Sequence, residues 1–208
     1  MKQFKYFFML IFVFSLFSQS GHSYFQSQRN DVVGGVVLQA NNGTTWGQWG
    51  EARFCPENTF VNGFSLKVEK HQGSDDDTAL NNIKLNCSSS YGENLEFEAD
   101  SKSNWGQYGG MSYCPSGSFV KGFSLKVEPK TTLGIDETAV NDFKALCGHY
   151  YTPVSSPNGQ KFGHFGNTVY CPGNSSVCGL SLRSEKPQGM SDDTAVNDVA
   201  LYCCYDQF

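Results

Sequence analysis

The sequence predicts an all-β fold built from three copies of one repeat of roughly sixty residues and held together by disulfides. Segments that begin at Trp46, Trp105 and Phe162 carry the same motifs in the same order, with offsets of 59 and then 57 residues. Apolar and polar residues alternate within each copy, which is typical of half-buried strands. Six of the eight cysteines occupy matching positions in the three copies.

The first element along the chain is a signal peptide, which we place at residues 1–23. Lys2 and Lys5 precede an apolar run of twelve residues, and small polar residues follow it. A membrane anchor is the alternative, but a helix that spans a bilayer needs about twenty apolar residues. We therefore expect cleavage after Ser20 or Ser23, secretion to the extracellular space, and no insertion into the membrane.

The rest of the chain, residues 24–208, is predicted to form a single domain. Its three repeats cover about residues 32–90, 91–148 and 149–205. Without residues 1–20 the chain carries 13 basic and 20 acidic residues, a net charge of −7. No basic stripe is present, so nucleic acid is not an expected partner.

Each copy is expected to contain two long strands with alternating apolar residues. The first strand places Phe64, Leu66, Phe123, Leu125, Leu180 and Leu182 on the inner face. The second strand covers residues 83–87, 143–147 and 199–203. A further strand is expected at residues 32–37, and residues 95–97 are its counterpart before the second copy.

Three copies can stack as a linear solenoid or close around a threefold axis. The closed form leaves few open strand edges, and the sequence shows no polar capping repeat. In the closed form the strand at residues 32–37 could complete the last copy. We therefore favour closure.

The cysteines are predicted to form four disulfides, because an even number of cysteines follows a signal peptide. Equivalence between the copies gives the pairs Cys55–Cys87, Cys114–Cys147 and Cys171–Cys203, and leaves Cys178–Cys204. Exchange of Cys203 with Cys204 is the main alternative, but adjacent strand residues face opposite ways. No cysteine pair has the C-x2-C spacing of a zinc site, and we expect neither a metal nor a cofactor.

These motifs resemble the vitelline membrane outer layer protein 1 family over about residues 32–205. The resemblance rests on the W-G-x-W-G opening, the C-P pair, the strand G-F-S-L-K-V-E and the segment D-D-T-A-x-N-D. It implies a β-prism of three Greek-key sheets around a pseudo-threefold axis, a shape shared with jacalin-type lectins. It also implies a secreted protein of egg coats and other extracellular secretions. The third copy departs from the pattern at Phe162, Phe165 and Ser184.

Equivalent acidic residues are the candidates for glycan contact. Glu69, Glu128 and Glu185 end equivalent strands, and Asp77, Glu137 and Asp193 precede equivalent threonines. Carboxylate pairs of this kind could bind sugar hydroxyls or act as the acid and base of a glycosidase. We favour a structural role in surface ion pairs and turns, because a catalytic pair is needed once and a turn is needed in every copy.

Aromatic residues and glycosylation sequons complete the list of candidates. The residues Trp46, Trp49, Trp105, Tyr108, Phe162 and Phe165 could stack on sugars, but we favour burial in the core because large rings bury much area. Asn42 and Asn174 are predicted N-glycosylation acceptors. Asn86 also lies in a sequon, but it precedes the bridged Cys87 and is the poorest acceptor.

The sequence therefore favours a secreted coat or matrix protein without enzymatic activity, whose expected partners are extracellular glycans or other coat proteins. Two alternatives stay open. One is a β-prism lectin, and the other is a weak glycosyl-transferring enzyme that acts on N-acetylglucosamine oligomers.

Overall fold

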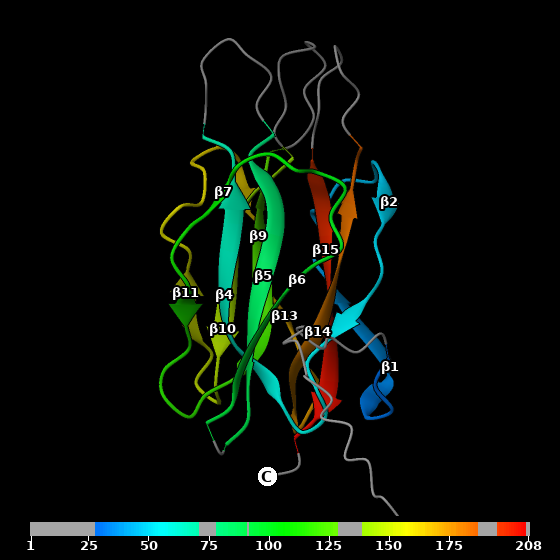
Figure 1. Cartoon of the computed structure of the whole chain (residues 1–208), viewed down its shortest axis with the longest axis vertical. Helices are drawn as coiled ribbons and strands as arrows, with labels where there is room; N and C mark the ends of the chain where they lie inside the picture. Colours follow the sequence, from blue (N-terminus) through cyan, green and yellow to red (C-terminus); the bar gives the residue numbers. More distant parts are fainter. Residues whose placement is uncertain (1–27, 71–77, 91, 129–138, 187–194, 207–208) are drawn as a thin grey trace, which may run out of the picture.

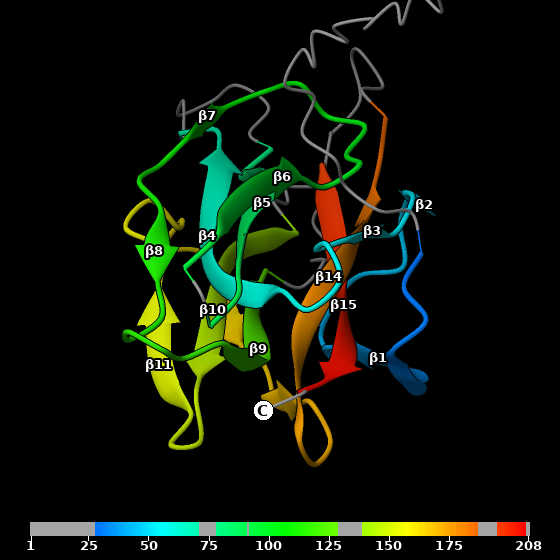
Figure 2. The ribbon, with the colours of Figure 1, turned by 60° about the horizontal axis from the view of Figure 1, so that its bottom comes forward.

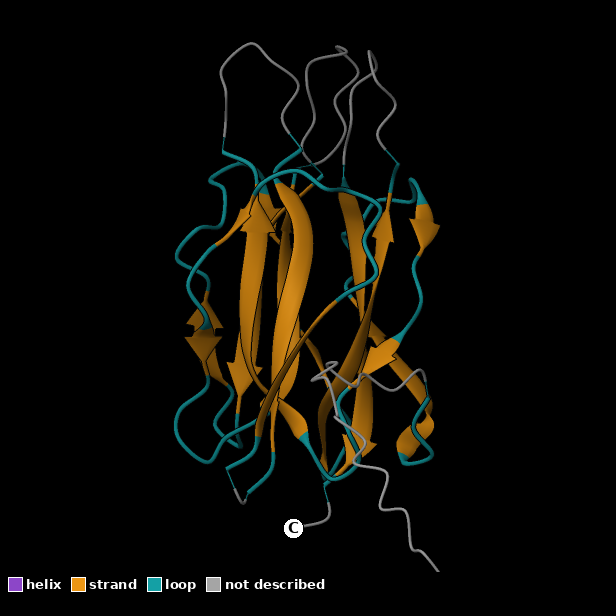
Figure 3. Ribbon diagram, in the orientation of Figure 1, coloured by secondary structure: helices purple, strands orange, loops and turns teal. Residues whose placement is uncertain are grey.

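The computed structural model describes residues 28–70, 78–90, 92–128, 139–186 and 195–206, which contain β-strands and no α-helix (Figure 3). The predicted signal peptide, residues 1–23, lies outside these residues. Within them, no helix is long and apolar enough to cross a membrane. The all-β class predicted from the sequence is thereby confirmed.

The strands form three five-stranded sheets. The first sheet has the order β6 (Asn94–Glu98), β5 (Leu80–Ser88), β4 (Phe60–Val68) and β7 (Gln107–Tyr108), and β8 (Ser112–Tyr113) also pairs with β4. The second has the order β11 (Thr152–Ser155), β10 (Val140–Cys147), β9 (Val120–Val127) and β12 (His164–Phe165), and β13 (Val169–Tyr170) also pairs with β9. The third has the order β1 (Val32–Gln39), β15 (Val196–Tyr205), β14 (Ser175–Ser184) and β2 (Gln48–Trp49), and β3 (Arg53–Phe54) also pairs with β14.

Each sheet combines strands from two copies of the repeat, and this exchange closes the ring. Strands β7 and β8 belong to the second copy but pair with β4 of the first, and β12 and β13 of the third copy pair with β9 of the second. Strands β2 and β3 of the first copy pair with β14 of the third. Strand β1 pairs with β15, so the stretch at residues 32–37 completes the last copy as expected. Figures 1 and 2 show the three sheets around a common interior.

The inner faces of the three sheets meet in one apolar core. All six residues predicted to face inward are buried, and the rings of Phe64 and Phe123 both contact Phe143 of β10. The centroid distances to the Phe143 ring are 5.0 Å from Phe64 and 5.4 Å from Phe123. Burial of large aromatic rings is a main source of stability in such a core.

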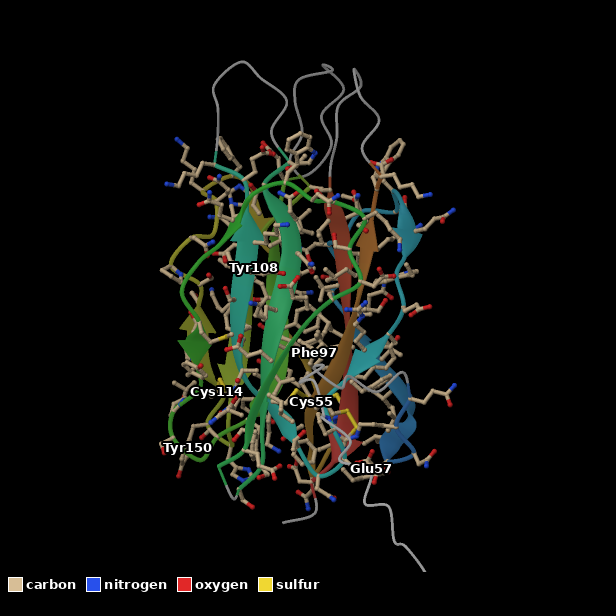
Figure 4. All side chains as sticks on the ribbon, in the orientation of Figure 1. Cys55, Glu57, Phe97, Tyr108, Cys114 and Tyr150 are labelled. Atoms are coloured by element: carbon tan, nitrogen blue, oxygen red, sulfur yellow. A yellow bond between two sulfur atoms is a disulfide. The ribbon has the colours of Figure 1, made fainter. Side chains whose placement is uncertain are left out.

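All four predicted disulfides are present, and two of their cysteines are labelled in Figure 4. Cys203 pairs with Cys171 within the main core, whereas Cys204 pairs with Cys178 in a smaller cluster that includes Phe54 and Phe60. The two adjacent cysteines thus face opposite sides of β15, as strand geometry requires. The alternative exchange of Cys203 with Cys204 does not occur.

Candidate functional site

The three glutamates singled out from the sequence lie at one end of the prism, which we call the glutamate end. Glu69 follows β4, Glu128 follows β9 and Glu185 follows β14, and all three side chains are half-buried. The strand ends are linked across copies, because Gln160 Nε2 donates to the Glu69 carbonyl oxygen at 2.7 Å and Lys126 Nζ donates to the Gln160 carbonyl oxygen at 3.0 Å.

The carboxylate of Glu69 links the end of β4 to the residues just before β5. Its Oε2 atom accepts a hydrogen bond of 2.5 Å from Thr78 Oγ1, and the backbone N–H of Glu69 donates to the Ala79 carbonyl oxygen at 2.8 Å. Asn81, which is fully buried, donates from Nδ2 to Thr78 Oγ1 at 2.8 Å. These contacts fit the structural role that we favoured for this glutamate.

The other two copies repeat the backbone part of this arrangement. Glu128 donates its N–H to Ala139 and Glu185 donates to Ala195, at 2.8 and 2.9 Å. All three alanines have a positive φ, between 39° and 49°, which is uncommon for a residue other than glycine. The predicted partner acids Asp77, Glu137 and Asp193 lie outside the described residues, so their pairing with the glutamates stays a prediction.

A groove of about 770 Å³ opens beside Glu69 at the glutamate end. Its wall combines the end of β4, strand β7 of the second copy and the segment that leads into the third copy. The side chains that matter for recognition are Glu69, Lys70, Gln107, Tyr108, Asn158 and Gln160. Among the described residues, Glu69 is the only carboxylate that lines this groove.

A smaller groove of about 290 Å³ occupies the matching position beside Glu185. Here Gln48 takes the place that Gln107 has in the larger groove, and the side chains of Lys102 and Lys186 add positive charge. The two grooves therefore share a position in the repeat but differ in size and charge, so they cannot recognise the same ligand equally.

The aromatic residues of the W-G-x-W-G segments are not in the core, so the burial favoured from the sequence is wrong. Trp46, Trp49 and Trp105 are 47%, 40% and 54% exposed, and the equivalent Tyr108, Phe162 and Phe165 are half-buried. The intervening glycines explain the error. Gly47, Gly106 and Gly163 have φ of 73° to 77°, and an added Cβ would lie 2.1–2.5 Å from backbone atoms of the neighbouring long strand. The backbone packs against that strand, and about half of each tryptophan side chain is left exposed.

Lysine side chains lie over three of these rings, those of Tyr108, Phe162 and Phe165. Lys84 Nζ lies 4.6 Å from the centroid of the Tyr108 ring, and Lys144 Nζ lies 3.7 Å from that of Phe165. Burial, together with the nearby carboxylate of Glu98, raises the pKa of Tyr108 well above its ordinary value. The phenol of Tyr108 therefore stays neutral and presents a rigid aromatic wall to the groove.

Two buried aspartates were missed in the sequence. Asp142 of β10 and Asp198 of β15 both accept a hydrogen bond of 2.8 Å from the next backbone N–H, and burial raises the pKa of both. Asn82 is the equivalent residue of the first copy and accepts the same bond from Ile83. The interchange of Asn and Asp is a signal in the sequence that this position needs an oxygen acceptor and not a charge.

The predicted glycosylation acceptors differ in their surroundings. Asn174 is exposed, whereas Asn42 is half-buried and donates from Nδ2 to the Leu125 carbonyl oxygen at 3.0 Å. Asn86 is buried, and its Nδ2 donates to Asn62 Oδ1 and Asn94 Oδ1. The nitrogen that would carry the glycan is thus engaged in Asn42 and in Asn86.

No metal chemistry is indicated by the part of the chain that the structure describes. Within it, no group of three or more His, Cys, Asp or Glu side chains could hold a metal ion. The groove beside Glu69 instead offers amide groups, an ammonium group and aromatic surface. Such a lining suits the reversible binding of a polar ligand that also has an apolar face.

Comparison with known proteins identifies relatives of the chain over most of its length. The family model described as vitelline membrane outer layer protein I (VOMI) matches residues 36–206. The mouse vitelline membrane outer layer protein 1 homolog (Mus musculus) is 39% identical over 172 residues, which cover 81% of this chain and 83% of that protein. The human homolog (Homo sapiens) is 40% identical over 173 residues, with the same coverage.

Solved structures with a similar fold include several lectins. Calystegia sepium agglutinin superimposes with a TM-score of 0.52 at 13% identity, over 82% of this chain and 96% of that one. Frutapin, a lectin from Artocarpus incisa, gives a TM-score of 0.51 at 13% identity, over 85% and 99%. AcmJRL, a mannose-binding jacalin-related lectin from Ananas comosus, gives 0.50 at 10% identity, over 82% and 97%. At these identities the likeness shows the fold, a three-sheet β-prism.

Proposed function

Because this chain belongs to the vitelline membrane outer layer protein I family, we propose that it is a secreted, non-enzymatic coat or matrix protein that binds extracellular glycans. The name of the family supports the coat role. Four disulfides behind a predicted signal peptide support secretion, since disulfides persist in oxidising compartments.

The observation that carries glycan binding is the groove beside Glu69, together with an exposed tryptophan, Trp105, next to a wall residue in the chain. Trp105 directly precedes Gly106 of the groove wall and is 54% exposed. An exposed tryptophan offers a flat apolar surface on which the C–H face of a pyranose can lie, and amides such as Gln107 can bond its hydroxyls. The analogy with lectins that share the prism shape supports this use of the fold.

The surroundings of Glu69 support a role without catalysis. Hydrolysis or transfer of a glycosyl group generally needs two carboxyl groups that flank one bond, one of them held protonated. The carboxylate of Glu69 accepts a hydrogen bond from Thr78 Oγ1, and no other described carboxylate lines the groove. A binding role uses these residues without that requirement.

A glycan array on the secreted protein tests the proposal. The variants Trp105→Ala and Gln107→Ala remove the apolar surface and one amide of the groove. Tyr150→Ala is the matched control, because Tyr150 is an aromatic residue that is 95% exposed and lies far from Tyr108 (Figure 4). We expect the wild type and Tyr150→Ala to bind the same glycans and Trp105→Ala to lose at least about tenfold in affinity.

Two outcomes would contradict this function. One is the absence of any glycan signal from the wild-type protein. The other is a signal that Trp105→Ala, Gln107→Ala and Tyr150→Ala weaken equally, since the groove would then have no special part in binding.

A further inference from the structure

A second hollow lies at the other end of the prism, where β9 and β14 begin. Its volume is about 650 Å³, which falls within the range of small-molecule sites. Lys121, Phe119, Asn174, Ser176 and Asp206 are among the residues that line it. We call it the lysine pocket.

The lysine pocket exists because the third copy departs from the other two. Ser176 stands five residues after Cys171, where the first two copies carry Phe60 and Phe119. The rings of Phe60 and Phe119 pack against each other with centroids 5.5 Å apart. The serine supplies no third ring, so space is left beside this pair.

Two further residues of the pocket are of types that the other copies do not carry at the corresponding places. Lys121 occupies the position of Asn62 in the first copy and Cys178 in the third, and Asp206 lies beyond the end of the third repeat. A repeated structural role would appear in every copy. Three residues unique to one place instead indicate a site that is needed once.

The polar groups of the pocket are buried but incompletely paired. The side chain of Lys121 is 10% exposed, and its Nζ atom donates to the Ser175 carbonyl oxygen at 3.0 Å and to Asp206 Oδ2 at 2.5 Å. An ammonium group has three donors, so one N–H remains. Asp206 Oδ1 and Ser176 Oγ are buried without a hydrogen-bond partner. Buried polar groups left unpaired are costly, so this set of groups points to a ligand.

We propose that the lysine pocket binds a neutral saccharide or related polyol through two adjacent hydroxyl groups. One hydroxyl donates to Asp206 Oδ1, and its neighbour accepts from Lys121 Nζ. Ser176 Oγ bonds a further hydroxyl, and the half-buried Phe119 ring contacts the apolar face of the sugar. The Lys121–Asp206 ion pair has no net charge. An anionic ligand would be repelled by the Asp206 carboxylate, and a cationic ligand would be repelled by the Lys121 ammonium group. A neutral diol satisfies both.

This site is separate from the groove of the proposed function. It lies at the start of β9 and β14, whereas the glutamate end lies beyond their last residues. Variants at one end should leave binding at the other unchanged, and the failure of one site would not imply failure of the other.

Saturation-transfer NMR with methyl glycosides of mannose, galactose and N-acetylglucosamine tests the proposal, with glucuronate as the anionic comparison. All proteins are produced in the bacterial periplasm, where disulfides form and no N-glycan is attached, and the unchanged sequence serves as the background. The reason is that Ser176 also supplies the hydroxyl of the Asn174 sequon, so that a change at Ser176 would otherwise remove a glycan as well.

Two variants remove the site in different ways. Ser176→Phe restores the aromatic residue of the other copies and fills the space. The double change Lys121→Gln with Asp206→Asn removes both charges together and leaves neither ion buried alone. Glu96→Gln, at an exposed position of β6 that lines neither the lysine pocket nor the groove beside Glu69, is the control, and a thermal melt checks that each variant is folded.

We expect a neutral glycoside to bind with about millimolar affinity, more tightly than glucuronate, and to lose at least about tenfold in both site variants but not in Glu96→Gln. If Ser176→Phe does not fold, the affinity measured for the Lys121→Gln, Asp206→Asn double variant decides whether the proposal holds. The proposal is overturned if no neutral glycoside binds, which would mean that the pocket holds water only, or if the folded site variants bind as well as the background.

Discussion

The side-chain nitrogen of Asn42 donates a hydrogen bond of 3.0 Å to the carbonyl oxygen of Leu125, which lies 83 residues away in the second copy. Asn158 makes the matching bond of 2.9 Å to Leu66 of the first copy. The Leu125 carbonyl oxygen also accepts from the backbone N–H of Gly166. These bonds tie the segment that leads into one copy to the long strand of another, and so help to hold the ring closed.

The engagement of Asn42 leads to a prediction about glycosylation. A chain modified at Asn42 would lose the bond to Leu125 and could not place a glycan at this contact, because an added Cβ on Gly166 would already lie 2.3 Å from the Asn42 side chain. We expect the secreted protein to carry its N-glycan at Asn174 alone. Removal of the glycan by an endoglycosidase should shift the wild type and Asn42→Gln on a gel but should not shift Asn174→Gln. A shift retained by Asn174→Gln would show that another sequon is used.

A core prediction concerns Phe123, whose ring stacks on Phe143 with an interplanar angle of 18°. Phe123→Ala should lower the free energy of unfolding by about 3–5 kcal/mol, because it leaves a cavity between two sheets. Tyr150→Ala is the control and should change it by less than about 0.5 kcal/mol, since Tyr150 is 95% exposed. Urea unfolding without reductant measures both. Equal effects would mean that Phe123 is not a core residue.

The buried Asp142 predicts an unusual pH dependence. Burial raises its pKa above the ordinary value of 3.8, while Lys126 and Lys144 act in the opposite direction. The folded state therefore disfavours the ionised form. This unfavourable contribution is fully present above the raised pKa and disappears as the pH falls through it towards 3.8. Asp142→Asn should stabilise the protein at neutral pH, because it removes a charge that burial disfavours, and the gain should vanish in acid.

Asn82→Asp provides the mirror test at the equivalent position of the first copy. The Nδ2 atom of Asn82 donates to the Ala99 carbonyl oxygen at 3.3 Å, so an aspartate there loses a bond and gains a charge. This variant should be less stable than the wild type at neutral pH and should recover part of the loss in acid. Thermal melts across a pH series measure both variants. A pH-independent effect of Asp142→Asn would mean that its carboxyl group does not carry the predicted penalty.

Most features that could be predicted from the sequence recur in every copy, and the single bridge Cys178–Cys204 followed once the recurring cysteines were paired. The fixed offsets of Cys55, Cys114 and Cys171 predicted the bridges, and the alternation around Phe64 and Phe123 predicted the core. A motif that recurs in all three copies identifies an element of the fold, because the same local interactions form that element in each copy.

The features that could not be predicted depend on which neighbour a residue meets. Trp105 looks like a core residue by composition, and only the close approach of Gly106 to β4 shows why its ring is left outside the core. The replacement of an aromatic residue by Ser176 is visible when the copies are aligned. Its consequence, an open pocket, appears only once Phe60, Phe119 and Asp206 are placed around it.

The three glutamates at the glutamate end can be tested for a catalytic role. The triple change Glu69→Gln, Glu128→Gln and Glu185→Gln should leave secretion intact and cost little stability, because a glutamine oxygen can still accept the bond that Thr78 Oγ1 gives to Glu69. A large loss of stability would instead mean that the link between β4 and β5 needs the negative charge.

The same variant decides between a coat protein and an enzyme. A glycosyl-transferring enzyme needs a carboxyl group held protonated near neutral pH by an apolar site or a close second carboxylate. Glu69 instead accepts from a hydroxyl, beside a groove that also contains Lys70 and Gln160. We therefore expect no product when wild type and triple variant are incubated with N-acetylglucosamine oligomers and analysed by mass spectrometry. Clear turnover by the wild type that the triple variant loses would make these glutamates catalytic, because glutamine preserves their shape and hydrogen bonds but not their acidity.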